Sequence, residues 1–276
     1  MDLDKPAGDP RDIALVENVA VSDAEAEALP APAAAPLMWG YGDLLYFVLF
    51  AVPAIFFVAI ICAAGFMGLN LLLGWDLALD NVRVQAPLVI VIQLFWWLLV
   101  YGYIYYVVTS KYDLPFGPSI GWKPLHRAPA FYLLSGIILA FSVAGISALI
   151  PRPDTTLPME ALLQDQLSVI LMALFGVIVA PVAEEVVFRG FLYRVFENKH
   201  GVATAIILTS LPFAVLHGPQ YGWQWQNLSL LFGVAIVFGI IRARTGSVVS
   251  STLVHVAYNA TLFSVLFAAG EHLKKT

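Results

Sequence analysis

The sequence predicts an all-α fold, a polytopic transmembrane helical bundle of seven to eight helices, and three observations lead to it. Of the 276 residues, 60% are hydrophobic and 12% are charged, whereas soluble domains carry about 25% charged residues. The mean hydropathy is +0.83, so lipid is the expected solvent for most of the chain. Apolar segments long enough to cross a bilayer also recur along the sequence. The single cysteine, Cys62, excludes an internal disulfide and a Cys-based zinc site.

The first 40 residues differ from the rest in composition. They hold eight acidic residues against Lys5 and Arg11, and they end in the Ala- and Pro-rich run 30–36. Such a segment has little apolar surface to bury, so we expect residues 1–40 to form a disordered cytoplasmic tail. Its acidic start also differs from a signal peptide. Residues 41–276 are expected to form one transmembrane domain.

Seven apolar segments follow in that domain. They cover residues 44–74, 86–109, 131–150, 167–197, 202–217, 227–241 and 247–269. A membrane-spanning helix needs about 20 residues. The fourth segment is long and becomes polar halfway, and the fifth and sixth are short. We therefore expect seven spans, or eight if a long segment is broken.

Basic residues orient the predicted bundle. They follow the second, fourth and sixth segments as Lys111, Lys123 and Arg127, then Arg189, Arg194 and Lys199, then Arg242 and Arg244. The positive-inside rule then places the N-terminus and these loops in the cytoplasm, with Lys274 and Lys275 as exceptions. The composition of the tail and the short loops favour a prokaryotic plasma (inner) membrane. Nothing in the composition indicates nucleic-acid binding.

Two adjacent carboxylates and an arginine interrupt the fourth apolar segment. An ionisable group inside a span costs about 2.5–3.5 kcal/mol even on the mildest scale, so such groups commonly mark functional sites. Glu185 and Arg189 are four residues apart and share a helix face, so they are expected to pair. Glu184 points about 100° away from Glu185 and remains free to face another group.

Polar residues of two later segments are expected to reach the level of Glu184. Segments four and five form a hairpin that turns near residues 200–201, and Glu184 and His217 lie 16 and 17 residues from His200. At 1.5 Å per residue, both lie about 24 Å from the turn. His255 and Asn259, four residues apart in the last segment, form one polar face at a similar depth. Arg189 and further polar residues toward the turn predict a wet cavity open to the cytoplasm.

This convergence is more typical of a functional site than of structural hydrogen bonding, although a single intramembrane His or Glu–Arg pair could be structural. A carboxylate and a neutral imidazole can hold a water and remove its proton. An imidazole N–H and an amide NH₂ can stabilise the oxyanion that forms. A zinc-dependent membrane metalloprotease is the main competing chemistry. The zinc signature His-Glu-x-x-His is absent, and Asn259 is a poor zinc ligand. A proton-coupled transporter is a further alternative.

A second motif resembles a different protease chemistry. Gly40-Tyr41-Gly42-Asp43 and Tyr112-Asp113 match the Gly-x-Gly-Asp and Tyr-Asp motifs of intramembrane aspartyl proteases. Their order along the chain is reversed, and both aspartates lie at the edges of spans. We expect Asp43 to be the N-cap of the first span instead.

Three motifs in order resemble those of the CPBP intramembrane protease family, which includes the type II CAAX prenyl endopeptidases and the Abi proteins. Residues 184–189 match Glu-Glu-x-x-x-Arg, residues 213–217 match Phe-x-x-x-His, and residues 255–259 match His-x-x-x-Asn/Asp. The motifs occupy roughly the last third of the chain. The first 130 residues match the family only in being apolar helices.

The resemblance implies an intramembrane glutamic endopeptidase that needs no cofactor or metal. It makes Glu184 the base that activates water and His217 the residue that helps to hold it. His255 and Asn259 then form the oxyanion hole. Supporting roles fall to Glu185, Arg189 and Phe213. The implied substrate is a membrane-anchored or prenylated protein or peptide; eukaryotic relatives cleave prenylated CAAX proteins, whereas many bacterial members have no such substrate. A non-catalytic membrane immunity or transport protein on the same fold is the alternative.

Overall fold

The computed structural model describes residues 38–151 and 155–268. All regular secondary structure in these two ranges is helical, which confirms the all-α class. Most of the expected tail of residues 1–40, as well as Lys274 and Lys275, lies outside the described residues. Six helical stretches of the described chain are long and apolar enough to cross a membrane, which supports an integral membrane protein.

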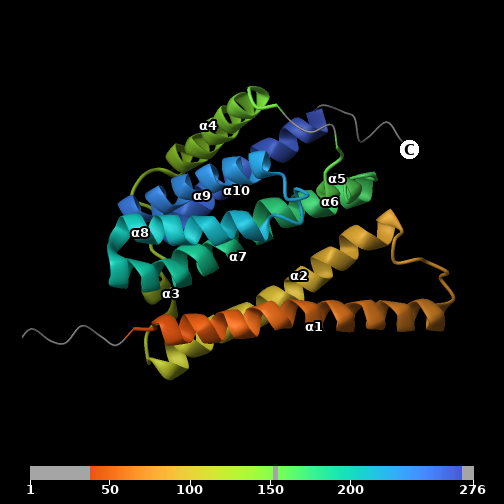
Figure 1. Cartoon of the computed structure of the whole chain (residues 1–276), viewed down its shortest axis with the longest axis horizontal. Helices are drawn as coiled ribbons and strands as arrows, with labels where there is room; N and C mark the ends of the chain where they lie inside the picture. Colours follow the sequence, from red (N-terminus) through yellow and green to blue (C-terminus); the bar gives the residue numbers. More distant parts are fainter. Residues whose placement is uncertain (1–37, 152–154, 269–276) are drawn as a thin grey trace, which may run out of the picture. The chain divides into compact units, whose positions relative to one another are not determined.

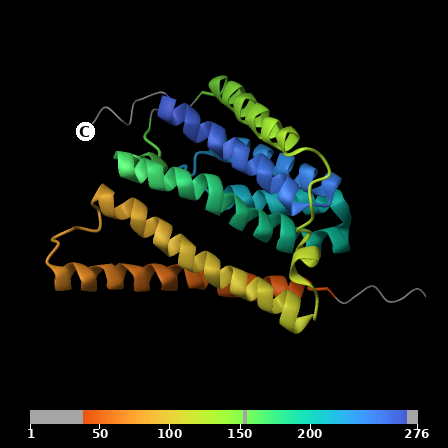
Figure 2. The same ribbon diagram turned by 180° about the vertical axis from the view of Figure 1, so that it is seen from behind.

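The first two long helices are neighbours in both views (Figures 1 and 2). Helix α1 covers Tyr41–Leu73, and α2 covers Val82–Tyr105 and continues into the π-helical segment η1, Tyr106–Lys111. The N-cap of α1 is Gly40, and Asp43 is its third residue, so the N-cap expected at Asp43 was wrong. The Asp43 carboxylate reaches back to accept the N–H of Gly40 at 3.0 Å, which satisfies a donor that the helix start leaves free.

Three helices, each shorter than α1 and α2, lead to the second half of the chain. Helix α3 covers Phe116–Ile120, α4 covers Pro129–Ala148, and α5 covers Pro158–Ala161. Only α4 is long and apolar enough to cross a membrane. It starts with Pro129 in its first turn, a position where the missing N–H of proline has no consequence.

The central stretch runs from Gln166 to Leu216 and is divided by two π-helical segments. Its order is α6 (Gln166–Leu174), η2 (Phe175–Val179), α7 (Ala180–Glu185), η3 (Val186–Leu192) and α8 (Tyr193–Leu216). Inside α8 the chain leaves the helical conformation at Gly201, where φ is 81° and ψ is 174°. The two arms fold back on each other there (Figure 1), so the hairpin was predicted at the right residues. The predicted fourth and fifth segments therefore lie within one of the six stretches, Gln166–Leu216.

The last two helices complete the bundle around this hairpin. Helix α9 covers Trp225–Thr245 and α10 covers Val248–Ala268. Helices α4 and α10 lie side by side in both views (Figures 1 and 2). They approach closely at Gly136 of α4, where a Cβ atom would lie 2.6 Å from the Cβ of Ala257. All seven residues of η3 are buried in the core.

Candidate active site

One carboxylate faces two imidazoles inside the bundle. Glu184 comes from α7, His217 follows the last residue of α8, and His255 lies in α10. The Nε2 atom of His217 is 3.9 Å from Glu184 Oε1. The Nε2 atom of His255 is 3.8 Å from Glu184 Oε2. The structure thus brings together three of the residues singled out in the sequence, at separations that a single bridging water can span.

The end of helix α8 orients the ring of His217. The last carbonyls of a helix lack a backbone partner, and one of them is that of Phe213. The Nδ1 atom of His217 donates to this carbonyl at 2.7 Å. In the neutral imidazole, the proton therefore resides on Nδ1, and Nε2 presents a lone pair to Glu184. The Phe-x-x-x-His spacing provides this i, i−4 contact.

The second carboxylate, Glu185, orients His255 instead. Glu185 Oε1 lies 3.1 Å from Arg189 Nη1, as the spacing of these two residues predicted. The same oxygen accepts a hydrogen bond from His255 Nδ1 at 3.2 Å. Arg189 Nη2 donates to the carbonyl of Ala235 in α9 at 2.8 Å. Because both charged side chains are 0% exposed, the pair sets a fixed orientation for His255 in a dry environment.

Aromatic rings enclose the ion pair and His255. The guanidinium of Arg189 lies 4.7 Å from the ring centroid of Phe213 and 5.4 Å from that of Phe238. Phe238 also stacks on His255, with centroids 4.4 Å apart and an interplanar angle of 27°. Sequence reasoning named Phe213 but missed Phe238, because a phenylalanine in an apolar helix carries no signal that separates it from core.

Asn259 lies one helical turn beyond His255 but bonds elsewhere. Its Nδ2 atom donates to the carbonyl of Gly176 in η2 at 2.7 Å. One of its two amide hydrogens is thereby used in a contact between α10 and η2, and the other is left for a further partner.

Tyr221, in the loop between α8 and α9, adds a phenol to the surroundings of Glu184. Tyr221 follows α8 and lies outside the membrane-spanning helices. Burial raises the pKa of Tyr221, and the nearby charge of Glu184 raises it further. The hydroxyl of Tyr221 therefore stays protonated near the carboxylate of Glu184. The sequence offered a signal for it, since a tyrosine four residues after a site histidine shares its turn.

The expected wet opening toward the hairpin turn is not formed at Arg189. This residue and the rest of η3 are buried, and Arg189 is 0% exposed. Inside the core its guanidinium donates one hydrogen bond to the carbonyl of Ala235 and pairs with the carboxylate of Glu185. Nearer the turn, Arg194 and Glu197 form a partly exposed ion pair at 3.4 Å. The site keeps some exposure at Glu184 and His217, whose side chains are 15% and 17% exposed.

The aspartyl-protease-like residues occupy a separate position. Asp43 is buried and accepts hydrogen bonds from Lys111 Nζ at 2.5 Å and from the Tyr112 hydroxyl at 2.7 Å. Together with the N–H of Gly40, these donors occupy both carboxylate oxygens. Asp43 therefore joins the start of α1 to the end of η1, which is a structural role.

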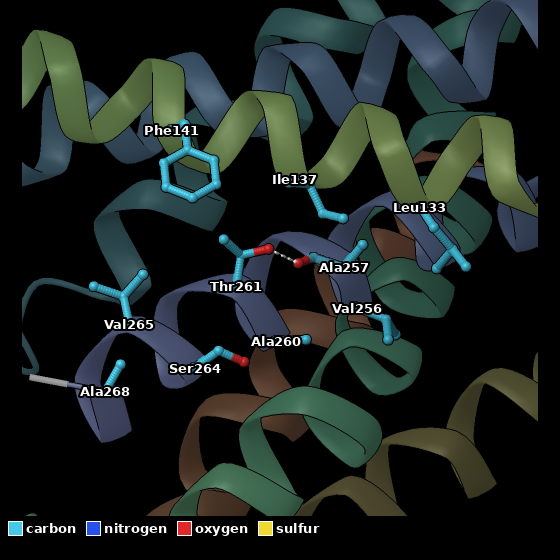
Figure 3. A pocket seen from close by; sticks show the side chains of 10 residues that line it. All are labelled: Leu133, Ile137, Phe141, Val256, Ala257, Ala260, Thr261, Ser264, Val265 and Ala268. Carbon is cyan, nitrogen blue, oxygen red and sulfur yellow. Dashed lines mark hydrogen bonds between the residues drawn. The ribbon is translucent and has the colours of Figure 1, made fainter.

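A groove lies between α4 and α10 (Figure 3). Its lining includes Leu133, Ile137 and Phe141 of α4 and Ala257, Thr261 and Val265 of α10. Thr261 donates its hydroxyl hydrogen to the carbonyl of Ala257 at 2.8 Å. Since successive residues are about 100° apart around a helix, Ala257 points about 200° away from His255. The groove is lined without a titratable side chain and belongs to the opposite face of α10.

Metal ligation has one favourable feature and one unfavourable feature at this site. Both imidazoles have Nδ1 bound to an acceptor, as metal-ligating histidines usually do, and both direct Nε2 at Glu184. Nevertheless, within residues 38–151 and 155–268, no three His, Cys, Asp or Glu side chains converge closely enough to hold a metal ion.

Comparisons with known proteins agree with the three motifs. An "Uncharacterized 24.3 kDa protein" of Escherichia coli is 34% identical over 104 residues, which cover 36% of this chain and 45% of that protein. The chain thus spans less than half the length of this curated relative. No solved structure matches. The family model described as "Type II CAAX prenyl endopeptidase Rce1-like" matches residues 166–261, so the family resemblance expected from the sequence is confirmed over the stretch that contains the site.

Proposed function

We propose that this chain is an intramembrane glutamic endopeptidase of the CAAX-protease type, which hydrolyses a peptide bond of a membrane-anchored or lipidated substrate. The observation that carries the proposal is the convergence of Glu184 and His255, within membrane-spanning helices, with His217 at the end of one, at 3.8–3.9 Å. We further propose that residues 1–40 are a tail and 41–276 the protease domain. The N-terminus would face the cytoplasm of a prokaryotic cell.

The first step is the activation of water by Glu184. A water between Glu184 and His217 can donate one hydrogen to the carboxylate and the other to the lone pair of His217 Nε2. Its own lone pair then faces the carbonyl carbon of the substrate. Glu184 removes a proton as the oxygen attacks, and a tetrahedral intermediate forms. The same carboxylic acid returns the proton to the leaving amine, the C–N bond breaks, and a carboxylic acid and an amine result.

Stabilisation of the oxyanion is assigned to His255 and Asn259. Because His255 Nδ1 donates to Glu185, its Nε2 can donate to the oxyanion only when the ring carries a second proton. In that form the charged ring would lie beside the carboxylate of Glu185. Asn259 has one amide hydrogen free of the bond to Gly176 and can add a second donor. Burial of these groups strengthens their electrostatic interaction with the intermediate.

Cleavage by the purified protein in liposomes tests the proposal. Three matched peptides, prenylated, acylated and unmodified, separate the substrate classes. Glu184→Gln should lower kcat by about 10²–10⁴-fold, since this is the range of general base catalysis. Glu197→Gln is the matched control, because Glu197 belongs to the same helical stretch but pairs with Arg194 near the surface. Full activity of Glu184→Gln would refute the mechanism.

The same assay separates the two alternatives. The orientation of both Nε2 atoms toward Glu184 favours a zinc-dependent hydrolase as the second candidate. Loss of wild-type cleavage with a chelator, restored by added zinc, would favour that candidate. A non-catalytic immunity or transport protein predicts no cleavage of any of the three peptides.

A further inference from the structure

Side chains from four other parts of the fold donate hydrogen bonds to the backbone of residues 175–192, which carry the site's two glutamates. Each bond ends on a backbone carbonyl of that stretch. The pairs are Asn259 Nδ2 to Gly176 O at 2.7 Å, Tyr101 Oη to Val182 O at 3.0 Å, Arg242 Nε to Arg189 O at 3.0 Å, and Trp39 Nε1 to Phe191 O at 3.0 Å. The donors come from α10, α2, α9 and the residues before α1.

This stretch has an unusual need for external hydrogen bonds. Helix α7 has only six residues and lies between two π-helical segments, η2 and η3. A π-helix is rarely stable by itself and is commonly found at functional sites. If a π-helical turn relaxed into an α-helical one, the residues beyond it would shift by one position and rotate by about 100°. Glu184 would then no longer face both histidines.

We propose that Trp39 and Tyr101 are positioning residues of the candidate active site, which hold the backbone of α7 and η3 so that Glu184 faces His217 and His255. Tyr101 bonds the carbonyl two residues before Glu184. Trp39 is 2% exposed and stacks on Phe191, with centroids 5.4 Å apart and an interplanar angle of 11°. Both lie outside residues 166–261, the part of the chain that matches the family model.

Two neighbouring donors provide matched controls, because they make the same kinds of bond to a different helix. Tyr103 of α2 donates its hydroxyl hydrogen to the carbonyl of Asp43 at 2.9 Å. Trp96, also of α2, donates Nε1–H to the carbonyl of Ala51 at 2.8 Å. Their acceptors belong to α1, so their loss should leave the α7 backbone in place.

Hydrogen exchange of the full-length protein in detergent tests the positioning directly. In Tyr101→Phe the ring remains and only the hydroxyl donor is removed, and in Trp39→Phe a phenyl ring without a donor replaces the indole. Amide exchange across 175–192 should therefore rise about two- to tenfold, the effect of one net hydrogen bond. Tyr103→Phe and Trp96→Phe should leave that stretch unchanged. Unchanged exchange in both test variants would overturn the proposal, and this measurement does not depend on any enzymatic activity.

Kinetics test the consequence for catalysis, which rests on the proposed function. We expect kcat to fall about two- to tenfold in Tyr101→Phe and Trp39→Phe with KM unchanged, and both constants to stay at the wild-type level in the two controls. Replacement of Tyr101 by 4-aminophenylalanine, whose amine can donate to Val182 O, should restore kcat. Equal losses in test and control variants would overturn a positioning role. Full activity of Glu184→Gln would instead refute the proposed mechanism while leaving the exchange result interpretable.

Discussion

The ion pair between Glu185 and Arg189 makes the sharpest prediction about stability. Both side chains are 0% exposed, and the charged atoms are 3.1 Å apart. Arg189→Met keeps most of the side-chain volume but leaves the carboxylate of Glu185 buried, with His255 Nδ1 as its remaining hydrogen-bond donor. An unpaired charge in that position must either be desolvated or take up a proton, and either outcome destabilises the folded protein.

The magnitude follows from the separation and the burial. At an effective dielectric constant of about 20, Coulomb's law gives about 5 kcal/mol for unit charges at this distance. Breaking a buried pair by removing one partner costs about 3–5 kcal/mol. We therefore expect Arg189→Met to lower the free energy of unfolding by about 4 kcal/mol, which corresponds to a decrease in Tm of about 10 °C. The double variant Glu185→Gln/Arg189→Met should recover about 2 kcal/mol or more, because it removes the orphaned charge.

Thermal unfolding in detergent, followed by tryptophan fluorescence, measures these differences. Arg194→Met is the control, since Arg194 and Glu197 form a pair whose side chains are 26% exposed. Solvent screening limits such a pair to about 0–1 kcal/mol. If Arg189→Met were no more destabilising than Arg194→Met, or if the double variant were as unstable as the single one, the buried pair would not have the role we give it.

Three further predictions concern helix packing and helix ends. Gly136→Ala should destabilise the protein by about 1–3 kcal/mol in the same unfolding assay, because its Cβ would lie 2.6 Å from the Cβ of Ala257; Gly145→Ala in the same helix meets no atom within 4 Å and should be neutral or stabilising. Asp165→Ala removes the N-cap of α6 and should cost about 1 kcal/mol at neutral pH. Burial raises the pKa of Asp165, but hydrogen bonds from Ser168 and the N–H of Leu167 outweigh it and lower the pKa overall. The contribution of Asp165 is therefore present above the unfolded-state pKa of about 3.9 and is lost as the pH falls through the lower folded-state value, so wild type and variant should converge in acid. Lys111→Met should cost less than Asp43→Asn, since Asp43 retains Tyr112 and Gly40 as donors when Lys111 is removed; equal losses in the unfolding assay would contradict this ranking.

Local rules explain what could be predicted correctly about the site. The fixed rise of the α-helix placed Glu184 and His217 level with each other across a hairpin, and Gly201 is where the chain reverses. The i, i+4 rule paired Glu185 with Arg189. These inferences need only distances along one helix and the position of one turn.

Contacts between helices explain what could not be predicted. The bond from Asn259 to Gly176, the stacking of Phe238 on His255 and the bond from Tyr101 to Val182 join elements far apart in the chain. An apolar helix whose neighbours are unknown gives no sign of which ring or phenol will face the site. The closed packing around Arg189 likewise depends on the carbonyl of Ala235 in another helix.

The sequence by itself determined the environment, the spans, the hairpin and the identity of the polar residues inside them. It could do so because hydropathy and helical periodicity are properties of consecutive residues. Only the tertiary structure decided how Glu184 is presented to the two histidines. In the structure, π-helical turns lie on either side of α7, and side chains from helices α2, α9 and α10 donate hydrogen bonds to the backbone of α7, η3 and η2, respectively. Such turns have no reliable sequence signal, since a π-helical turn is stabilised by its neighbours rather than by its own residues.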